Sequence, residues 1–298
     1  MDSRVRGNDL VTNIQLFVAC VVIWGSTWLA ITFQLGRVAP EASVFYRFLL
    51  ASFLLFGFCA MRGLRLLYTR REHLWMALQG ILMFGPGYVF VYYAEQHVVS
   101  GLVAVGFSAS PLLGMLGLRL CFGTPMTRRM IAGSLMGIVG ITLVFWPEFQ
   151  RLGLGSRVVI GATYTVLAVV TSAMGSLVAH RNYDAGLPVW QTMAWGMLYA
   201  AVSVLLITVV MGQPFTFEAT IPYVASLLYL TVFGSIAAFA CYLTLLRRIG
   251  AAKSGYIGVM VPIVALVVSG FFEGFQWHVL TLIGIAISVA GNVLVLRR

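Results

Sequence analysis

The sequence predicts an all-α integral membrane protein of ten transmembrane helices built from two inverted five-helix repeats. Three observations support this class: the composition is strongly apolar, the apolar residues form ten segments of span length, and the second half of the chain repeats the first. Of 298 residues, 60% are apolar and 9% are charged, against about 25% charged in soluble domains. This composition excludes an ordinary soluble domain and a disordered chain, and β-barrel spans would leave a weaker, alternating signal.

Charged and turn residues divide the chain into ten apolar segments. Each has about 20 residues, enough to cross roughly 30 Å of hydrocarbon as a helix. The predicted spans are Ile14–Phe33, Ser43–Met61, His73–Tyr93, Ser100–Phe122, Arg128–Trp146, Val158–Ala179, Val189–Met211, Ile221–Leu245, Lys253–Phe272 and Trp277–Leu296. The connections are too short to hold a soluble domain, and no cleavage site follows the first segment, so we expect a retained first span.

The net charge of +10 reports orientation in the membrane. With the N-terminal tail in the cytoplasm, 15 of the 19 basic residues fall on the cytoplasmic side, as the positive-inside rule requires. The basic residues left outside are Arg37, Arg47, Arg151 and Arg157, and each outer loop carries one glutamate: Glu41, Glu95, Glu148, Glu218 or Glu273. We therefore expect both termini in the cytoplasm, an inner (plasma) membrane location, the lipid bilayer as partner, and no nucleic acid.

A shift of 151 residues aligns the two halves of the chain. It places Pro111 on Pro262, and it matches the small residues Gly123, Gly133, Gly137 and Gly140 with Gly274, Gly284, Ser288 and Gly291. We expect a cytoplasmic tail (1–13), a first repeat (14–146), an external linker (147–157) and a second repeat with a short cytoplasmic C-terminus (158–298). A unit of five spans is copied upside down, which is a recurrent plan of secondary transporters with a midplane substrate site. The alternative is that duplication only built a larger bundle.

Helix-breaking residues mark candidate hinges. Pro111 and Pro262 fall at midspan in matching spans, and Gly85 and Pro86 interrupt the third span. A proline removes a backbone donor and frees a carbonyl, which another group has to satisfy inside lipid. Plain kinks are the alternative. Gly133, Gly137, Gly140, Gly284, Ser288 and Gly291 have small-xxx-small spacing, which predicts close helix packing or a dimer face rather than substrate contact. We expect a monomer, with a dimer as the alternative.

Aromatic and polar side chains within the spans are the candidate substrate contacts. Tyr88 and Tyr92 are four residues apart and share one helix face. The predicted set is Trp24, Ser26, Tyr46, Tyr88, Tyr92, Trp195, Tyr199 and Tyr242, with packing or lipid-facing roles as the alternative. Arg47 is the clear charge within a span and should have a partner, in Glu95 or Glu41, as an ion pair or a gate. No acidic residue lies at midspan, which favours facilitated diffusion over proton coupling.

The sequence contains no motif typical of metal binding or of enzyme catalysis. The four cysteines and four histidines have no metal-ligand spacing, so we expect no metal, no cofactor and no disulfide framework. A membrane-embedded enzyme would need acid pairs or a nucleophile set within the spans, and a channel would show polar rings. Neither is visible, so we predict no catalytic residues and keep both classes as distant alternatives.

Several stretches resemble the drug/metabolite transporter (DMT) superfamily, and within it the ten-span EamA-type exporters. Trp24-Gly25-Ser26-Thr27 is similar to the W-G-[ST]-x signature of span one, and Tyr46-Arg47-Phe48 to the R-F start of span two. Residues 95–104 and 246–255 resemble the paired junctions of spans three to four and eight to nine. The resemblance covers residues 14–296.

Within this family the chain is most similar to YddG-type exporters of amino acids, including aromatic ones. The resemblance implies a basket of ten helices with spans five and ten outside the transport cavity. We therefore expect a secondary transporter that exports small metabolites, foremost amino acids, from the cytoplasm by alternating access as a uniporter. An exporter of other metabolites or drugs driven by proton exchange is the alternative.

Overall fold

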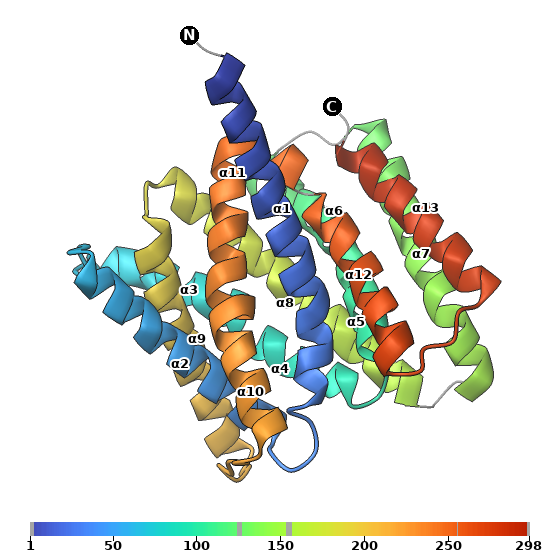
Figure 1. Ribbon diagram of the computed structural model, residues 1–298, viewed down its shortest axis with the longest axis horizontal. Coiled ribbons are helices and arrows are strands. Elements are labelled where there is room, and N and C mark those ends of the chain that lie inside the picture. Colours follow the sequence, from blue (N-terminus) through green and yellow to red (C-terminus); the bar gives the residue numbers. More distant parts are fainter. Residues whose placement is uncertain (1–2, 124–126, 153–156, 255, 297–298) are drawn as a thin grey trace.

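The computed structural model describes residues 3–123, 127–152, 157–254 and 256–296, and these ranges contain helices and no strand. The helices stand side by side, with the start of α1 and the end of α13 at the same end of the bundle (Figure 1). In chain order they are α1 (Ser3–Thr32), α2 (Pro40–Met61), α3 (Arg70–Phe84), α4 (Pro86–Glu95), α5 (Ser100–Gly106), η1 (Phe107–Ala109), α6 (Ser110–Phe122), α7 (Arg128–Leu152), α8 (Arg157–Asp184), α9 (Val189–Val210), α10 (Ile221–Tyr229), η2 (Leu230–Ala237), α11 (Ala238–Ser254), α12 (Ile257–Phe272) and α13 (Val279–Leu296).

The all-α membrane class predicted from the sequence agrees with this structure. Within the described residues, seven helical segments are long and apolar enough to cross a membrane, and three shorter apolar helices cover Ser100–Ala109, Met260–Phe272 and Val279–Leu294. Each predicted span overlaps one of these segments. Large apolar side chains such as Phe53, Leu206 and Val209 are more than half exposed on the surface. A surface of this kind is suited to lipid.

Helix ends differ from the predicted spans at two places. α1 begins at Ser3, so most of the predicted tail is helical, and α7 continues through Pro147 to Leu152 into the predicted linker. A helix satisfies its own backbone hydrogen bonds whether or not its side chains are apolar. Hydropathy marks only the apolar stretch of each helix, and the helix extends beyond it.

Three spans contain irregular backbone. Gly85 separates α3 from α4, with Pro86 as the first residue of α4, and the 3₁₀ turn η1 precedes α6, in which Pro111 is the second residue. Both breaks lie where the sequence predicts hinges. α12, by contrast, continues through Pro262. η2 is a π-helix between α10 and α11, and it was not predicted.

Helices α7 and α13 pack against each other at one edge of the bundle (Figure 1). A Cβ atom built on Gly140 would lie 2.5 Å from the Gly284 carbonyl oxygen, and one built on Gly291 would lie 2.5 Å from the Gly133 carbonyl oxygen. The predicted small-residue faces therefore meet within one chain, and the close approach depends on missing side chains.

Adding one methyl group at this crossing is expected to destabilise the fold. Gly140→Ala places a Cβ against backbone atoms that no rotamer change can move, and overpacking of this kind costs about 1–3 kcal/mol. Thermal unfolding of the detergent-solubilised protein, followed by fluorescence-detected size exclusion, should show a lower midpoint. Gly137→Ala is the matched control because its Cβ meets nothing within 4 Å. Equal midpoints for the two variants would contradict the packing argument.

Candidate functional site

Arg47 is a cation buried in the middle of the fold. It lies on α2, and its side chain is 2% exposed. Its Nε donates a hydrogen bond of 3.0 Å to Ser235 Oγ on η2, and its Cζ is 4.7 Å from the centroid of the Tyr88 ring. Nη1 is buried and has no hydrogen-bond partner. A buried guanidinium with an unused donor is prepared to bind an anion.

The π-helix η2 contacts the Arg47 side chain through Ser235. Its Gly234 carbonyl accepts a 3.2 Å hydrogen bond from Trp24 Nε1 on α1. A Cβ at Gly234 would lie 2.8 Å from Thr27 Cγ2 and 3.3 Å from Arg47 Nη2, so glycine allows both side chains to approach. π-helical turns are frequent at functional sites. Gly234 and Ser235 were not among the predicted site residues. The sequence feature that could have indicated them is a pair of small residues inside an apolar segment.

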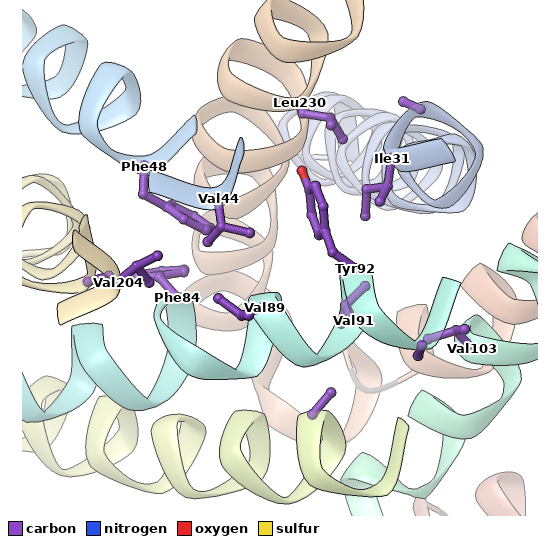
Figure 2. Close-up of a cluster of buried hydrophobic side chains, with 14 of the residues drawn as sticks. Ile31, Val44, Phe48, Phe84, Val89, Val91, Tyr92, Val103, Val204 and Leu230 are labelled. Atoms are coloured by element: carbon purple, nitrogen blue, oxygen red, sulfur yellow. The ribbon is translucent and has the colours of Figure 1, made fainter. Parts of the chain in front are cut away.

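Tyr88 and Tyr92 line the same region from α4. Tyr92 is fully buried, and its hydroxyl donates a 2.6 Å hydrogen bond to Gln34 Oε1 at the end of α1. Figure 2 shows the Tyr92 ring rising from α4 toward Ile31 of α1 and Leu230 of η2. Arg47 interacts electrostatically with both tyrosines. The predicted shared face of Tyr88 and Tyr92 therefore points at the buried cation.

Trp24, Ser26 and Tyr242 complete this group of side chains. The Trp24 ring lies 5.5 Å from the Tyr242 ring on α11 and 5.1 Å from the ring of Phe239. Ser26 Oγ is 2.7 Å from the Tyr229 hydroxyl on α10. Trp24, Tyr88 and Tyr92 thus lie around η2 and Arg47. Tyr242 packs against Trp24, and Ser26 faces Tyr229 of α10.

The other three predicted contacts lie elsewhere. The Tyr46 hydroxyl donates to the Thr216 carbonyl in the connection before α10, at 3.1 Å. Trp195 Nε1 donates to the Leu66 carbonyl at 3.2 Å, and Tyr199 Oη is 2.8 Å from His73 Nδ1 at the start of α3. Trp195 and Tyr199 form their own cluster with His73. Hydropathy did not separate these groups because α9 is apolar on all sides.

The glutamates at the opposite end of the bundle from the termini are unexpectedly buried. Glu41 on α2 is 0% exposed and accepts a hydrogen bond from the Tyr93 hydroxyl. Glu95, the last residue of α4, is 8% exposed, and neither carboxyl oxygen has a partner. The sequence analysis assigns both glutamates to outer loops; the structure instead buries Glu41 on α2 and Glu95 at the end of α4.

The predicted ion pair of Arg47 is not formed. In the described part of the chain, the contact within 4.0 Å between opposite charges joins His180 and Asp184, and neither Glu41 nor Glu95 approaches Arg47 to that distance. The described residues also contain no group of three histidine, cysteine or acidic side chains that would hold a metal ion. Arg47 and the ionisable Glu95 are thus both buried and do not pair with each other by direct contact.

Comparison with known proteins assigns the chain to a family. The model of the EamA-like transporter family matches residues 12–146 and 159–297, one match in each half of the chain. The chain belongs to the EamA-like transporter family. This EamA-like chain is therefore a membrane transporter of the drug/metabolite transporter superfamily.

This EamA-like transporter has relatives in several bacteria, and one of them, YedA, is described as a transporter. The inner membrane transporter YedA of Escherichia coli strain K12 is 29% identical over 290 residues, which cover 95% of this chain and 92% of YedA. PecM of Dickeya dadantii is 24% identical, over 87% of this chain and 83% of its own, and PagO of Salmonella typhimurium is 20% identical, over 87% and 84%. The family and the name of YedA indicate a transporter rather than an enzyme.

The fold also has a counterpart among solved structures. A chain of one crystal structure superposes with a TM-score of 0.70 and 17% identity, covering 95% of this EamA-like transporter and 96% of that chain. At this identity the likeness describes the fold alone.

Proposed function

We propose that the protein is a secondary transporter with ten spans in two inverted five-helix repeats. The two family matches support this division, with one match for each proposed repeat. The glycines with positive φ in the described residues also support it, because they form three pairs at spacings of 150, 149 and 151 residues. The pairs are Gly36 with Gly186, Gly63 with Gly212, and Gly123 with Gly274. Each pair closes the equivalent connection in the two halves.

Irregular backbone follows the same spacing. Residue 85, where the third proposed span breaks, corresponds to residue 236 in η2 of the eighth proposed span. Interrupted spans at a repeat interface are characteristic of substrate sites in secondary transporters. We place both termini in the cytoplasm, which the basic-residue bias supports, and the start of α1 and the end of α13 lie at one end of the bundle (Figure 1). The location we propose is the inner membrane.

The transported substrates are amino acids, including aromatic ones, exported from the cytoplasm by alternating access. The observation that carries this proposal is Arg47, a buried cation with a free Nη1 among the rings of Tyr88, Tyr92 and Trp24. A guanidinium binds a carboxylate with geometric specificity, and aromatic rings provide flat apolar surface for a side chain. Proteoliposomes loaded with labelled phenylalanine or threonine test this. Efflux no faster than from protein-free vesicles would refute it.

Removing the Tyr88 ring is expected to weaken transport while the protein still folds. Tyr88→Ala removes the ring beneath the Arg47 guanidinium and one wall of the proposed site. Because an aromatic contact contributes about 1 kcal/mol beyond burial, we expect KM for phenylalanine to rise about fivefold or more. The proteoliposome assay over a range of substrate concentrations measures this.

Two further variants define the role of the aromatic residues. Tyr92→Ala should act in the same direction as Tyr88→Ala, because Tyr92 shares the face and is fully buried. Phe53→Ala on α2 is the matched control, since Phe53 is 61% exposed on the surface. Unchanged kinetics in both tyrosine variants would remove these residues from the site.

A further inference from the structure

Glu95 is a buried acidic residue that has no role in the transport site proposed above. It ends α4, it is 8% exposed, and both carboxyl oxygens lack a hydrogen-bond donor. An ionised carboxylate in such surroundings is costly unless it is paired and hydrogen-bonded. Glu95 therefore requires a proton or a cationic ligand, because no group among the described residues donates to it.

The charged and titratable groups around Glu95 come from several elements. Arg47 of α2, Glu273 after α12 and Tyr92 on α4 itself interact with it electrostatically. Glu273 is already engaged: it accepts hydrogen bonds from the Ser100 backbone N–H, at 3.1 Å, and from the Ser100 hydroxyl. Glu41 is engaged by Tyr93, and the His97 ring stacks at 6.4 Å on Tyr164 of α8. Of the three glutamates, Glu95 is the one with both carboxyl oxygens unpartnered, whereas Glu41 has one engaged oxygen and one free oxygen, Oε2.

We propose that Arg47 and Glu95 are the two poles of a site for a zwitterion. Arg47 Nη1 takes the α-carboxylate of an amino acid, and the Glu95 carboxylate takes its α-ammonium group. The two side chains are both buried and interact electrostatically, but they stay more than 4.0 Å apart. An amino acid presents the two complementary charges together. This assignment rests on the proposed export of amino acids and adds how the headgroup is recognised.

A second consequence concerns the driving force. When the substrate leaves on the outer side, Glu95 takes a proton there, because an empty ionised Glu95 would remain unpaired in a buried position. After the site turns inward, Glu95 releases that proton to the cytoplasm and binds the ammonium group of the next substrate. The ammonium group and the proton compete for one carboxylate, so one proton enters for each zwitterion that leaves. This exchange replaces the uniport expected from the sequence.

The test separates proton exchange from transport itself. Proteoliposomes of wild-type protein, with the voltage clamped by potassium and valinomycin, receive a one-unit pH gradient. One-for-one exchange predicts an equilibrium phenylalanine ratio of about tenfold across the membrane, because one pH unit equals a factor of ten in proton activity. Glu95→Gln should lose the response to the gradient, and it should move phenylalanine downhill more slowly than wild type because the ammonium group loses its partner. Glu95→Asp, which keeps an acid, should restore the response.

Substrate analogues test the two poles directly. In competition with labelled phenylalanine, wild-type protein should prefer phenylalanine to 3-phenylpropionate, which lacks the ammonium group. In Glu95→Gln this preference should fall at least tenfold, whereas the preference over 2-phenylethylamine, which lacks the carboxylate, should persist. Glu218→Gln is the matched control, because Glu218 lies in the connection before α10 and bonds to Thr220.

Each outcome decides one proposal. If wild-type protein moves phenylalanine but ignores the pH gradient, or if Glu95→Gln responds to the gradient as wild type does, the role of Glu95 is overturned while amino-acid export stands. If wild-type protein moves no amino acid, the proposed function itself fails, and the zwitterion site fails with it.

Discussion

Replacing Arg47 with methionine is expected to abolish transport of carboxylate substrates without unfolding the protein. The guanidinium is 2% exposed and forms no ion pair within 4.0 Å, so methionine removes a buried charge and keeps much of the side-chain volume. Replacing buried charged groups with apolar residues of similar volume is often neutral or stabilising. Losing the charged partner of a buried carboxylate costs about 2–5 kcal/mol, which is roughly thirtyfold or more in kcat/KM. Proteoliposome efflux of phenylalanine and thermal unfolding of the same preparation measure the two effects.

Two variants define what Arg47 does. Arg47→Lys keeps the charge but loses the planar donor group and the geometry of the bond to Ser235, so its transport should lie between wild type and Arg47→Met. Arg62→Met is the matched control, because Arg62 is exposed and rests over Phe58 at 5.7 Å. If Arg47→Met unfolds, Arg47 has a structural role. If Arg47→Met transports as wild type does, Arg47 does not bind the substrate carboxylate.

The positions of the spans could be predicted because the bilayer imposes their apolar length, although α1 and α7 extend beyond the predicted ends. Gly85, Pro86 and Pro111 mark two of the breaks, whereas α12 continues through Pro262. The π-helix η2 could not be found in this way. Its widened turns present the Gly234 carbonyl to Trp24 and the Ser235 hydroxyl to Arg47, from helices nearly 200 residues away in sequence. These partners cannot be recognised from the local sequence around η2.

The sequence predicts parts of the candidate site only where residues on a single helix lie on the same face. Tyr88 and Tyr92 share a face because they are four residues apart, and the structure brings that face to Arg47. Trp195 and Tyr199 have the same spacing on α9 but face His73, because an apolar helix can turn any face toward its neighbours. The burial of Glu95 depends on how far adjacent helices extend, which hydropathy does not report.

The crossing of α3 and α9 depends on two glycines that are not equivalent. A Cβ atom built on Gly80 would lie 2.0 Å from the Gly196 carbonyl oxygen and 2.5 Å from its Cα. A Cβ atom built on Gly196 would have Gly80 Cα, at 3.4 Å, as its nearest neighbour, which is ordinary contact. The Cβ position of Gly80 points into the backbone of α9, whereas that of Gly196 points past α3.

Gly80→Ala is therefore expected to be more destabilising than Gly140→Ala. The obstructing atoms are backbone, so α3 and α9 must separate, and the cost should reach or exceed the upper end of the about 1–3 kcal/mol typical of overpacking. Separation would also pull Tyr199 and Trp195 on α9 away from His73 on α3. Size exclusion and thermal unfolding should show little folded Gly80→Ala protein, and Gly196→Ala should behave like wild type. Equal stability of the two alanine variants would contradict this prediction. It would mean that α3 and α9 can separate without a loss of stability and that the fold does not require glycine at position 80.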